Sequence, residues 1–253
     1  ASEIVESLTK VLSGTKYGIL ESVKGVLEKY NTVSGNLSEP EEIFVCPNLE
    51  QLLASDVHAD GVKWRLQCLN EDIGDLRGGS LGHVYARPDT GKTTFFASEI
   101  SFFASQIGDD EEIIWFNNEE RGQKVQLRIY SAITGRTLDE IAEDPEGTSE
   151  LFDKLGGNKI RIYDNAVITV SDIDAMLKDR NVRIVVIDQG DKIKFSGDKD
   201  MATHERLKAL YGKLRELAKK YNVDIITAGQ ADYTAEGRQF LHLSNMDNSK
   251  TGK

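Results

Sequence analysis

Short apolar runs alternate with amphipathic segments from about residue 62 to residue 230. The runs are rich in Val and Ile, and they predict five buried strands: LGHVYA (81–86), EEIIWFNN (111–118), KIRIYD (159–164), VRIVVID (182–188) and VDIITAG (223–229). Strands that are apolar along their whole length are buried on both faces, as in parallel sheets. The alternation therefore predicts an α/β fold with a mostly parallel sheet covered by helices on both faces.

The segments between these runs carry apolar residues at helical spacing. They predict helices over 93–106, 121–135, 138–142, 149–155 and 171–179, and a long helix with an apolar stripe from Leu207 to Tyr221. Ser171 or Asp172 is expected near the N-cap of helix 171–179, because both residue types accept hydrogen bonds from the first helical N–H groups.

The first 60 residues have a different pattern. Narrow apolar stripes over Ile4–Leu12 and Ile19–Tyr30 predict two short helices, and a stretch with Ser, Gly, Asn and Pro (31–42) predicts a linker. A further short helix is expected around Leu49–Ser55. We therefore expect a small helical N-terminal or linker segment over 1–60 and an α/β domain over 61–253.

Composition narrows the class of protein. Hydrophobic residues make up 39% and charged residues 29%, which suits a globular chain. No apolar run is long enough to span a membrane, and the two cysteines predict no disulfide framework, so we expect a cytoplasmic protein. The net charge of −11 argues against wrapping nucleic acid over the whole surface but permits a local basic channel.

A phosphate-binding loop is predicted between strand 81–86 and helix 93–106. The sequence there is Ala86, Arg87, Pro88, Asp89, Thr90, Gly91, Lys92, Thr93 and Thr94. Gly91 allows close approach of the backbone, Lys92 can reach the β- and γ-phosphates, and the Thr93 hydroxyl is placed to ligate Mg²⁺. The loop predicts binding of ATP with Mg²⁺, although the generic motif has Gly where Ala86 stands.

Carboxylates end two of the predicted strands. Glu119 and Glu120 follow strand 111–118, and Asp188 ends strand 182–188. A carboxylate at the C-terminal end of a parallel strand faces the crevice where such sheets bind ligands. Asp188 is expected to hold Mg²⁺ together with Thr93, and one of the two glutamates to activate the water that attacks the γ-phosphate.

ARPDTGKTT (86–94) resembles the phosphate loop of DnaB-type replicative helicases, in which Ala at the first position is normal. LNEDIGDLRGGSLGHVYARP (69–88) also resembles the lead-in of that family, and the likeness extends over residues 69–253. The resemblance implies a RecA-like P-loop NTPase core that hydrolyses ATP. It also implies a DNA helicase of replication, with a phage-like layout because no primase part is evident.

The resemblance implies roles for three side chains. The family's catalytic Glu is followed nine residues later by an Arg, and Glu119 with Arg128 reproduces this spacing. Glu119 is therefore the expected catalytic base and Glu120 the alternative. Gln230 resembles the Gln that ends the family's sensor strand, where it senses the γ-phosphate. Together with Lys92, Glu119 and Gln230 form the expected catalytic set.

The resemblance also implies a path for single-stranded DNA. In hexameric helicases, the loops after the Asp-bearing strand and after the sensor strand line a central channel; here these are 192–204 and 231–253. Their candidate DNA contacts are Lys192, Lys194, Lys199, Arg238, Lys250 and Lys253. A ring, hexameric in the full-length protein, is the expected assembly. The family motor continues beyond the sensor strand with a further hairpin, so we expect a chain trimmed at its C-terminus.

Two other functions are compatible with the same motifs. A RecA- or RadA-type recombinase has the same fold and chemistry, but recombinases usually keep the first Gly of the loop where Ala86 stands. A nucleotide-gated binding module would bind ATP with little turnover. The presence of Glu119 beside Asp188 disfavours such a module, because binding alone needs no base.

Overall fold

The computed structural model describes residues 48–53, 61–198, 201–231, 235–238 and 240–242. The chain divides into two units, residues 1–57 and residues 58–253. In the first unit, the described part is helix α3 (Leu49–Leu52) and the residues beside it. The helices expected within 4–30 and the linker 31–42 lie outside the described residues.

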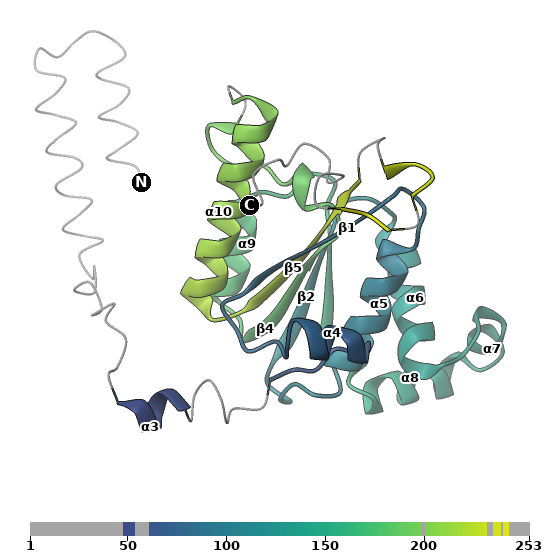
Figure 1. Cartoon of the computed structure of the whole chain (residues 1–253). Coiled ribbons are helices and arrows are strands. Elements are labelled where there is room, and N and C mark those ends of the chain that lie inside the picture. Colours follow the sequence, from purple (N-terminus) through teal and green to yellow (C-terminus); the bar gives the residue numbers. More distant parts are fainter. Residues whose placement is uncertain (1–47, 54–60, 199–200, 232–234, 239, 243–253) are drawn as a thin grey trace, which may run out of the picture. The chain divides into compact units, whose positions relative to one another are not determined.

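A five-stranded sheet forms the centre of the second unit (Figure 1). Its strands are β1 (Leu81–Ala86), β2 (Glu112–Asn117), β3 (Ile160–Asp164), β4 (Val182–Ile187) and β5 (Asp224–Gln230). The strand order is β1-β5-β4-β2-β3, and every neighbouring pair is parallel. The predicted α/β fold with a RecA-like parallel sheet is thus confirmed.

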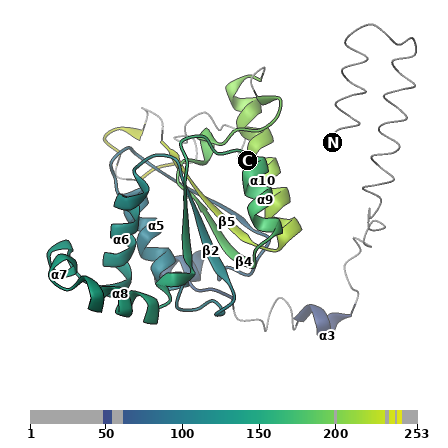
Figure 2. The same ribbon diagram turned by 180° about the vertical axis from the view of Figure 1, so that it is seen from behind.

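Helices cover both faces of this sheet, as the two opposite views show (Figures 1 and 2). One face carries α5 (Lys92–Phe103), α6 (Gly122–Thr134) and α8 (Pro145–Lys154), and the other carries α9 (Val170–Lys178) and α10 (Thr203–Tyr221). Successive residues of a strand point to opposite faces. Trp115 therefore packs in the first core and Phe116 in the second, and neither is exposed to solvent.

Several helix ends differ from the sequence-based predictions. Helix α5 begins at Lys92 and ends at Phe103, so residues 104–106 form turns beyond it. Helix α8 begins at Pro145, four residues before the expected start, because the Asp144 side chain accepts from Gly147 N–H and Pro145 fits the first helical position. Helix α7 (Leu138–Glu143) extends one residue beyond its expected end.

Ser171 and Asp172 lie near the N-cap of α9, as expected. The cap itself is Thr169, the residue before the helix begins at Val170. Its hydroxyl accepts from Asp172 N–H, and the Asp172 carboxylate accepts in return from Thr169 N–H at 2.8 Å. This reciprocal pair satisfies two helix-end donors at once, which a cap at either later residue would not do.

Helix α4 (Gln67–Asp72) was not predicted from the sequence. None of its residues is buried, so it has no apolar stripe that a periodicity search could detect. Two 3₁₀ turns, η2 (Gly157–Lys159) and η3 (Gly190–Lys192), were likewise not predicted. Among the described residues, no helix has the length and apolar character needed to cross a membrane.

Candidate nucleotide-binding site

The predicted phosphate loop joins β1 to α5. It leaves the sheet after Ala86, and Gly91, which precedes the first residue of α5, has a φ of 92°. This left-handed conformation is one that glycine adopts without steric cost. The first helical hydrogen bond runs from Phe95 N–H to Gly91 O at 2.8 Å, so the N–H groups of residues 92–94 have no intrahelical acceptor. They form the kind of helix N-terminus that binds phosphate.

Side chains of the loop donate hydrogen bonds to backbone carbonyl oxygens. Lys92 Nζ donates to the carbonyl oxygen of Arg87 at 3.2 Å, and the Thr90 hydroxyl donates to the same oxygen at 2.6 Å. The Arg87 guanidinium donates to the carbonyl oxygen of Arg238 at 2.9 Å. Among the described residues, the Lys92 ammonium thus has one weak hydrogen bond, which an anionic ligand can replace.

Thr93 and Asp188 meet beside the loop. The Thr93 hydroxyl donates to Asp188 Oδ2 at 3.1 Å, although the two residues lie 95 positions apart in the chain. Asp188 follows β4 directly and has no solvent exposure. Its other oxygen, Oδ1, is buried without a hydrogen-bond partner. A hydroxyl beside a free, buried carboxylate oxygen suits Mg²⁺, a cation that takes oxygen ligands.

Protein carboxylates alone would not complete such a cation site. Within the described part of the chain, no cluster of three or more His, Cys, Asp and Glu residues could hold a metal ion. Mg²⁺ commonly uses one or two protein oxygens and fills its other positions with water and phosphate. The residues present therefore fit a cation that arrives with a nucleotide.

The environment of Asp188 disfavours its charge in the metal-free protein. Burial, reinforced by the nearby negative charge of Glu119, raises the pKa of the Asp188 carboxyl to about 6. The hydrogen bond from Thr93 and the charge of Lys92 oppose this increase only in part. A bound cation would remove the conflict, because it stabilises the ionised carboxylate.

This shift gives a testable pH dependence for folding. The folded-state pKa of Asp188 lies above the ordinary value of 3.8, so the folded chain binds this proton more tightly than the unfolded chain. The stabilisation this proton provides is present below about pH 4 and is lost as the pH rises to about 6; its size is at most about 3 kcal/mol.

Asp188→Asn removes the titration. Relative to wild type, the variant's free energy of unfolding in urea should therefore be higher at pH 7.5 than at pH 4.5. An equal difference at both pH values would contradict the assignment.

The tandem acids lie in the turn between β2 and α6. Glu120 Oε1 contacts Arg128 Nη1 at 3.0 Å and Oε2 lies 3.7 Å from Lys124 Nζ; the hydrogen bond from Arg128 lowers the pKa of Glu120. Arg128, which the resemblance associates with Glu119, thus contacts Glu120 instead. The Glu119 side chain is exposed and makes no hydrogen bond or ion pair with any described residue.

One cavity brings the loop and the acids together. Its volume is about 220 Å³, and its lining residues are Asp89, Gly91, Lys92, Thr93, Thr94, Glu119, Glu120 and Arg128. The parallel sheet explains this meeting, because β1 and β2 both end at the same edge. The Lys92 ammonium from the loop and the carboxylates from the turn therefore face a shared space, which is an arrangement that suits phosphoryl transfer.

Four of the remaining predicted residues belong to the described part of the chain. Gln230 ends β5 and is in register with Ala86 on β1, so the expected sensor strand is the direct neighbour of the loop strand. Lys192, Lys194 and Arg238 are exposed. Lys199, Lys250 and Lys253 lie outside the described residues.

Sequence patterns did not reveal the residues that connect these parts. Gln189 follows Asp188 with a φ of 118°, unusual for a residue with a Cβ, and it is 2% exposed. Asn118 Nδ2 donates to its carbonyl oxygen at 3.2 Å and so links the acidic turn to the loop after β4. No residue type or spacing predicts a left-handed glutamine, so no sequence signal was present.

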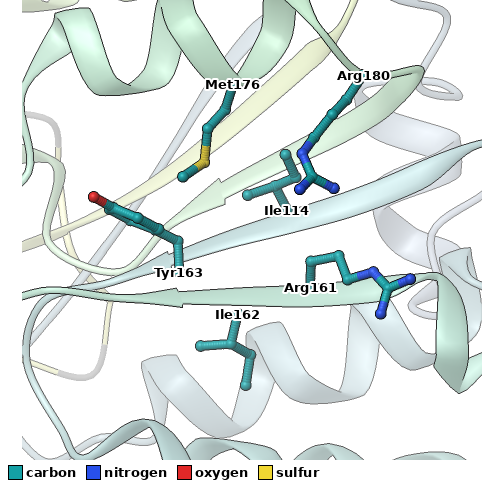
Figure 3. Close-up of a pocket in the computed structure, with 6 residues that line it drawn as sticks. All are labelled: Ile114, Arg161, Ile162, Tyr163, Met176 and Arg180. Atoms are coloured by element: carbon teal, nitrogen blue, oxygen red, sulfur yellow. The ribbon is translucent and has the colours of Figure 1, made fainter.

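A second hollow lies on the α9 face of the sheet, at strand β3 (Figure 3). Its volume is about 380 Å³, and it is lined by Ile114, Arg161, Ile162, Tyr163, Met176 and Arg180. Glu112 pairs with both guanidinium groups, at 3.3 Å to Arg161 and 2.9 Å to Arg180. None of the predicted nucleotide-binding residues lines this hollow, so the cavity at the phosphate loop is the candidate site.

Comparison with known proteins places the chain in a family. A family model described as an AAA domain matches residues 47–234. The replicative DNA helicase DnaB of Mycoplasma pneumoniae is 25% identical over 211 residues, which cover 76% of this chain and 43% of that protein. DnaB of Geobacillus stearothermophilus is 26% identical over 202 residues, covering 76% and 44%. The chain therefore spans less than half the length of these relatives.

Solved structures support the same fold. A DnaB-like replicative helicase, described with its interactions with primase, superposes with a TM-score of 0.66 at 15% identity, over 98% of this chain and 62% of that one. The predicted resemblance to DnaB-type helicases is confirmed by these matches. Because the family model covers most of the chain, this chain belongs to the AAA domain family, and it is similar over the same segment to replicative helicases of the DnaB type.

Proposed function

We propose that this chain is the ATP-hydrolysing motor of a replicative DNA helicase that moves along single-stranded DNA as a ring. The observation that carries the proposal is the joining of Thr93 to Asp188 beside the phosphate loop, in a cavity that Glu119 also lines. The relatives in which the matching segment occurs are named replicative DNA helicases. Their role in replication also supports a cytoplasmic location.

Binding of ATP with Mg²⁺ uses the loop and Asp188. The N–H groups at the start of α5 receive the phosphates, and the Lys92 ammonium leaves the Arg87 carbonyl to contact them. Thr93 and Asp188 would hold the cation, whose charge would offset the charge that develops on the phosphates during transfer. The buried Asp188 Oδ1, which has no hydrogen-bond partner among the described residues, fits this role.

Glu119 is the base in this proposal. Both of its neighbours form hydrogen bonds: Asn118 donates to the Gln189 carbonyl, and Glu120 accepts from Arg128. A carboxylate that pairs with Arg is a weak base, because the guanidinium stabilises its ionised form. Glu119 lines the same cavity without such a partner, and it can orient a water toward the γ-phosphate and accept its proton. Glu120 remains the alternative.

Gln230 and the exposed cations complete the proposal. Gln230 senses the γ-phosphate from the end of β5, beside the loop strand. Lys192, Lys194 and Arg238 contact phosphates of single-stranded DNA, and so do Lys199 and Lys250, which lie outside the described residues. Contacts of this kind follow the backbone and carry no base specificity. A hexameric ring is the assembly proposed for the full-length protein.

The decisive experiment measures ATP hydrolysis by the chain, with protein in excess over ATP, in the presence and absence of single-stranded DNA. We expect Mg²⁺-dependent hydrolysis that DNA accelerates, together with rings in electron micrographs of the full-length protein. Filaments on DNA would indicate a recombinase instead. Mg–ATP binding without hydrolysis, even with DNA present, would indicate a nucleotide-gated binding module.

A further inference from the structure

We propose that Asn117 is a positioning residue for hydrolysis, because its side-chain amide holds the turn that carries Glu119. The inference rests on the proposed function, since Asn117 can have this role only if Glu119 activates the attacking water. Asn117 is the last residue of β2, and its side chain is wholly buried. The turn that follows it leads into α6, which begins at Gly122.

The Asn117 amide joins three parts of the chain. Its Nδ2 donates to Asp164 Oδ1 and to the carbonyl oxygen of Glu120, each at 2.6 Å. Asp164 ends β3 and is in register with Asn117 on the neighbouring strand. One buried group therefore fixes the ends of two strands and the middle of the acidic turn relative to each other.

Asp164 fastens the far end of the same turn. Its second oxygen, Oδ2, accepts from Gly122 N–H at 2.9 Å, at the first residue of α6. Arg121, the N-cap of α6, provides no side-chain cap, so Asp164 supplies this cap from another strand. A Cβ at position 122 would lie 2.6 Å from Asp164 Oδ2, so any other residue there would displace the carboxylate that caps α6.

The consequence is a turn fixed at both ends with one free carboxylate. Between Asn117 and Arg121, Asn118 contacts the Gln189 carbonyl and Glu120 contacts Arg128, whereas Glu119 has no hydrogen bond or ion pair with the described residues. A base is effective when the group that carries it is held in place before substrate arrives. The amide of Asn117 thus acts on Glu119 through the backbone and does not touch the substrate itself.

If the link between Asn117 and Asp164 had a purely structural role, a variant that restores the link would hydrolyse ATP at the wild-type rate. In the reciprocal variant Asn117→Asp/Asp164→Asn, the new amide at 164 can donate to the new carboxylate at 117, and its oxygen can still accept from Gly122 N–H. The strand link and the helix cap are thereby restored. The carbonyl of Glu120, however, loses its donor and faces a carboxylate oxygen in its place, so the turn is no longer held at this point.

The test compares wild type, Asp164→Asn, the reciprocal double variant and a matched control, Asp174→Asn. Asp174 contacts Lys220 and Tyr221 on the opposite face of the sheet and is in no part of the site. Three quantities are measured: the thermal midpoint, the Mg–ATP affinity, and the single-turnover rate of hydrolysis with single-stranded DNA. We expect the double variant to keep the wild-type affinity, to melt lower by no more than the loss of one buried hydrogen bond explains, and to hydrolyse ATP about 10- to 100-fold more slowly. Asp164→Asn should also be slow with unchanged affinity, and the control should match wild type.

Wild-type hydrolysis by the double variant would overturn the inference, since it would show that the link serves stability alone. Should the double variant fail to fold, a wild-type rate for Asp164→Asn would overturn it equally. Failure of the proposed function has a different signature: wild type itself would not hydrolyse ATP, or Glu119→Gln would hydrolyse it at the wild-type rate.

Discussion

Lys92→Ala should weaken Mg–ATP binding by about 10- to 100-fold, because a hydrogen bond to a charged group contributes about 1.5–3 kcal/mol. Hydrolysis should fall further, below detection, since no other residue of the loop beyond Arg87 is cationic and Arg87 contacts the Arg238 carbonyl. A fluorescent ATP analogue measures the affinity, and phosphate release measures the rate.

The fold should survive this substitution, because the Lys92 ammonium contacts only the carbonyl of Arg87 among the described residues. The thermal midpoint of the variant should therefore equal that of wild type. Lys154→Ala is a matched control: Lys154 is exposed in the last turn of α8 and does not line the cavity. Wild-type ATP affinity in a folded Lys92→Ala chain would remove the loop from the nucleotide site.

Glu119→Gln should retain Mg–ATP binding and lose about 10²–10⁴ in the rate of hydrolysis, which is the usual contribution of a positioned general base. Glutamine keeps the shape of the side chain and its exposure but cannot accept the proton of the attacking water. Single-turnover hydrolysis with saturating Mg–ATP isolates this step from binding.

Glu120→Gln is the comparison that separates the two acids. It removes a charge that pairs with Arg128 and Lys124, so we expect a lower thermal midpoint and a smaller loss of rate than for Glu119→Gln. If Glu120→Gln caused the larger loss of rate with unchanged affinity, Glu120 would be the base, and the nine-residue spacing from Glu119 to Arg128 would have no functional meaning.

The order and type of the main elements followed from local sequence patterns. Runs such as IVVI (184–187) are apolar throughout, and a run of this kind can bury both faces only in a covered sheet. The phosphate loop was equally predictable, because the conformation of Gly91 and the chemistry of Lys92 and Thr93 are properties of neighbouring residues. Local patterns therefore predicted which residues form the loop, and in which order along the chain they occur.

Contacts between side chains that are distant in the sequence depend on the tertiary structure. Asn117 and Asp164 are 47 residues apart, and their contact depends on the pairing of β2 with β3. Whether Arg128 pairs with Glu119 or with Glu120 depends on how the turn enters α6. The raised pKa of Asp188 arises because packed neighbours exclude water from its carboxylate, and burial of this kind is created by the whole fold. Residue spacing carries no record of these distances, so the chemistry of the site was predictable while its geometry was not.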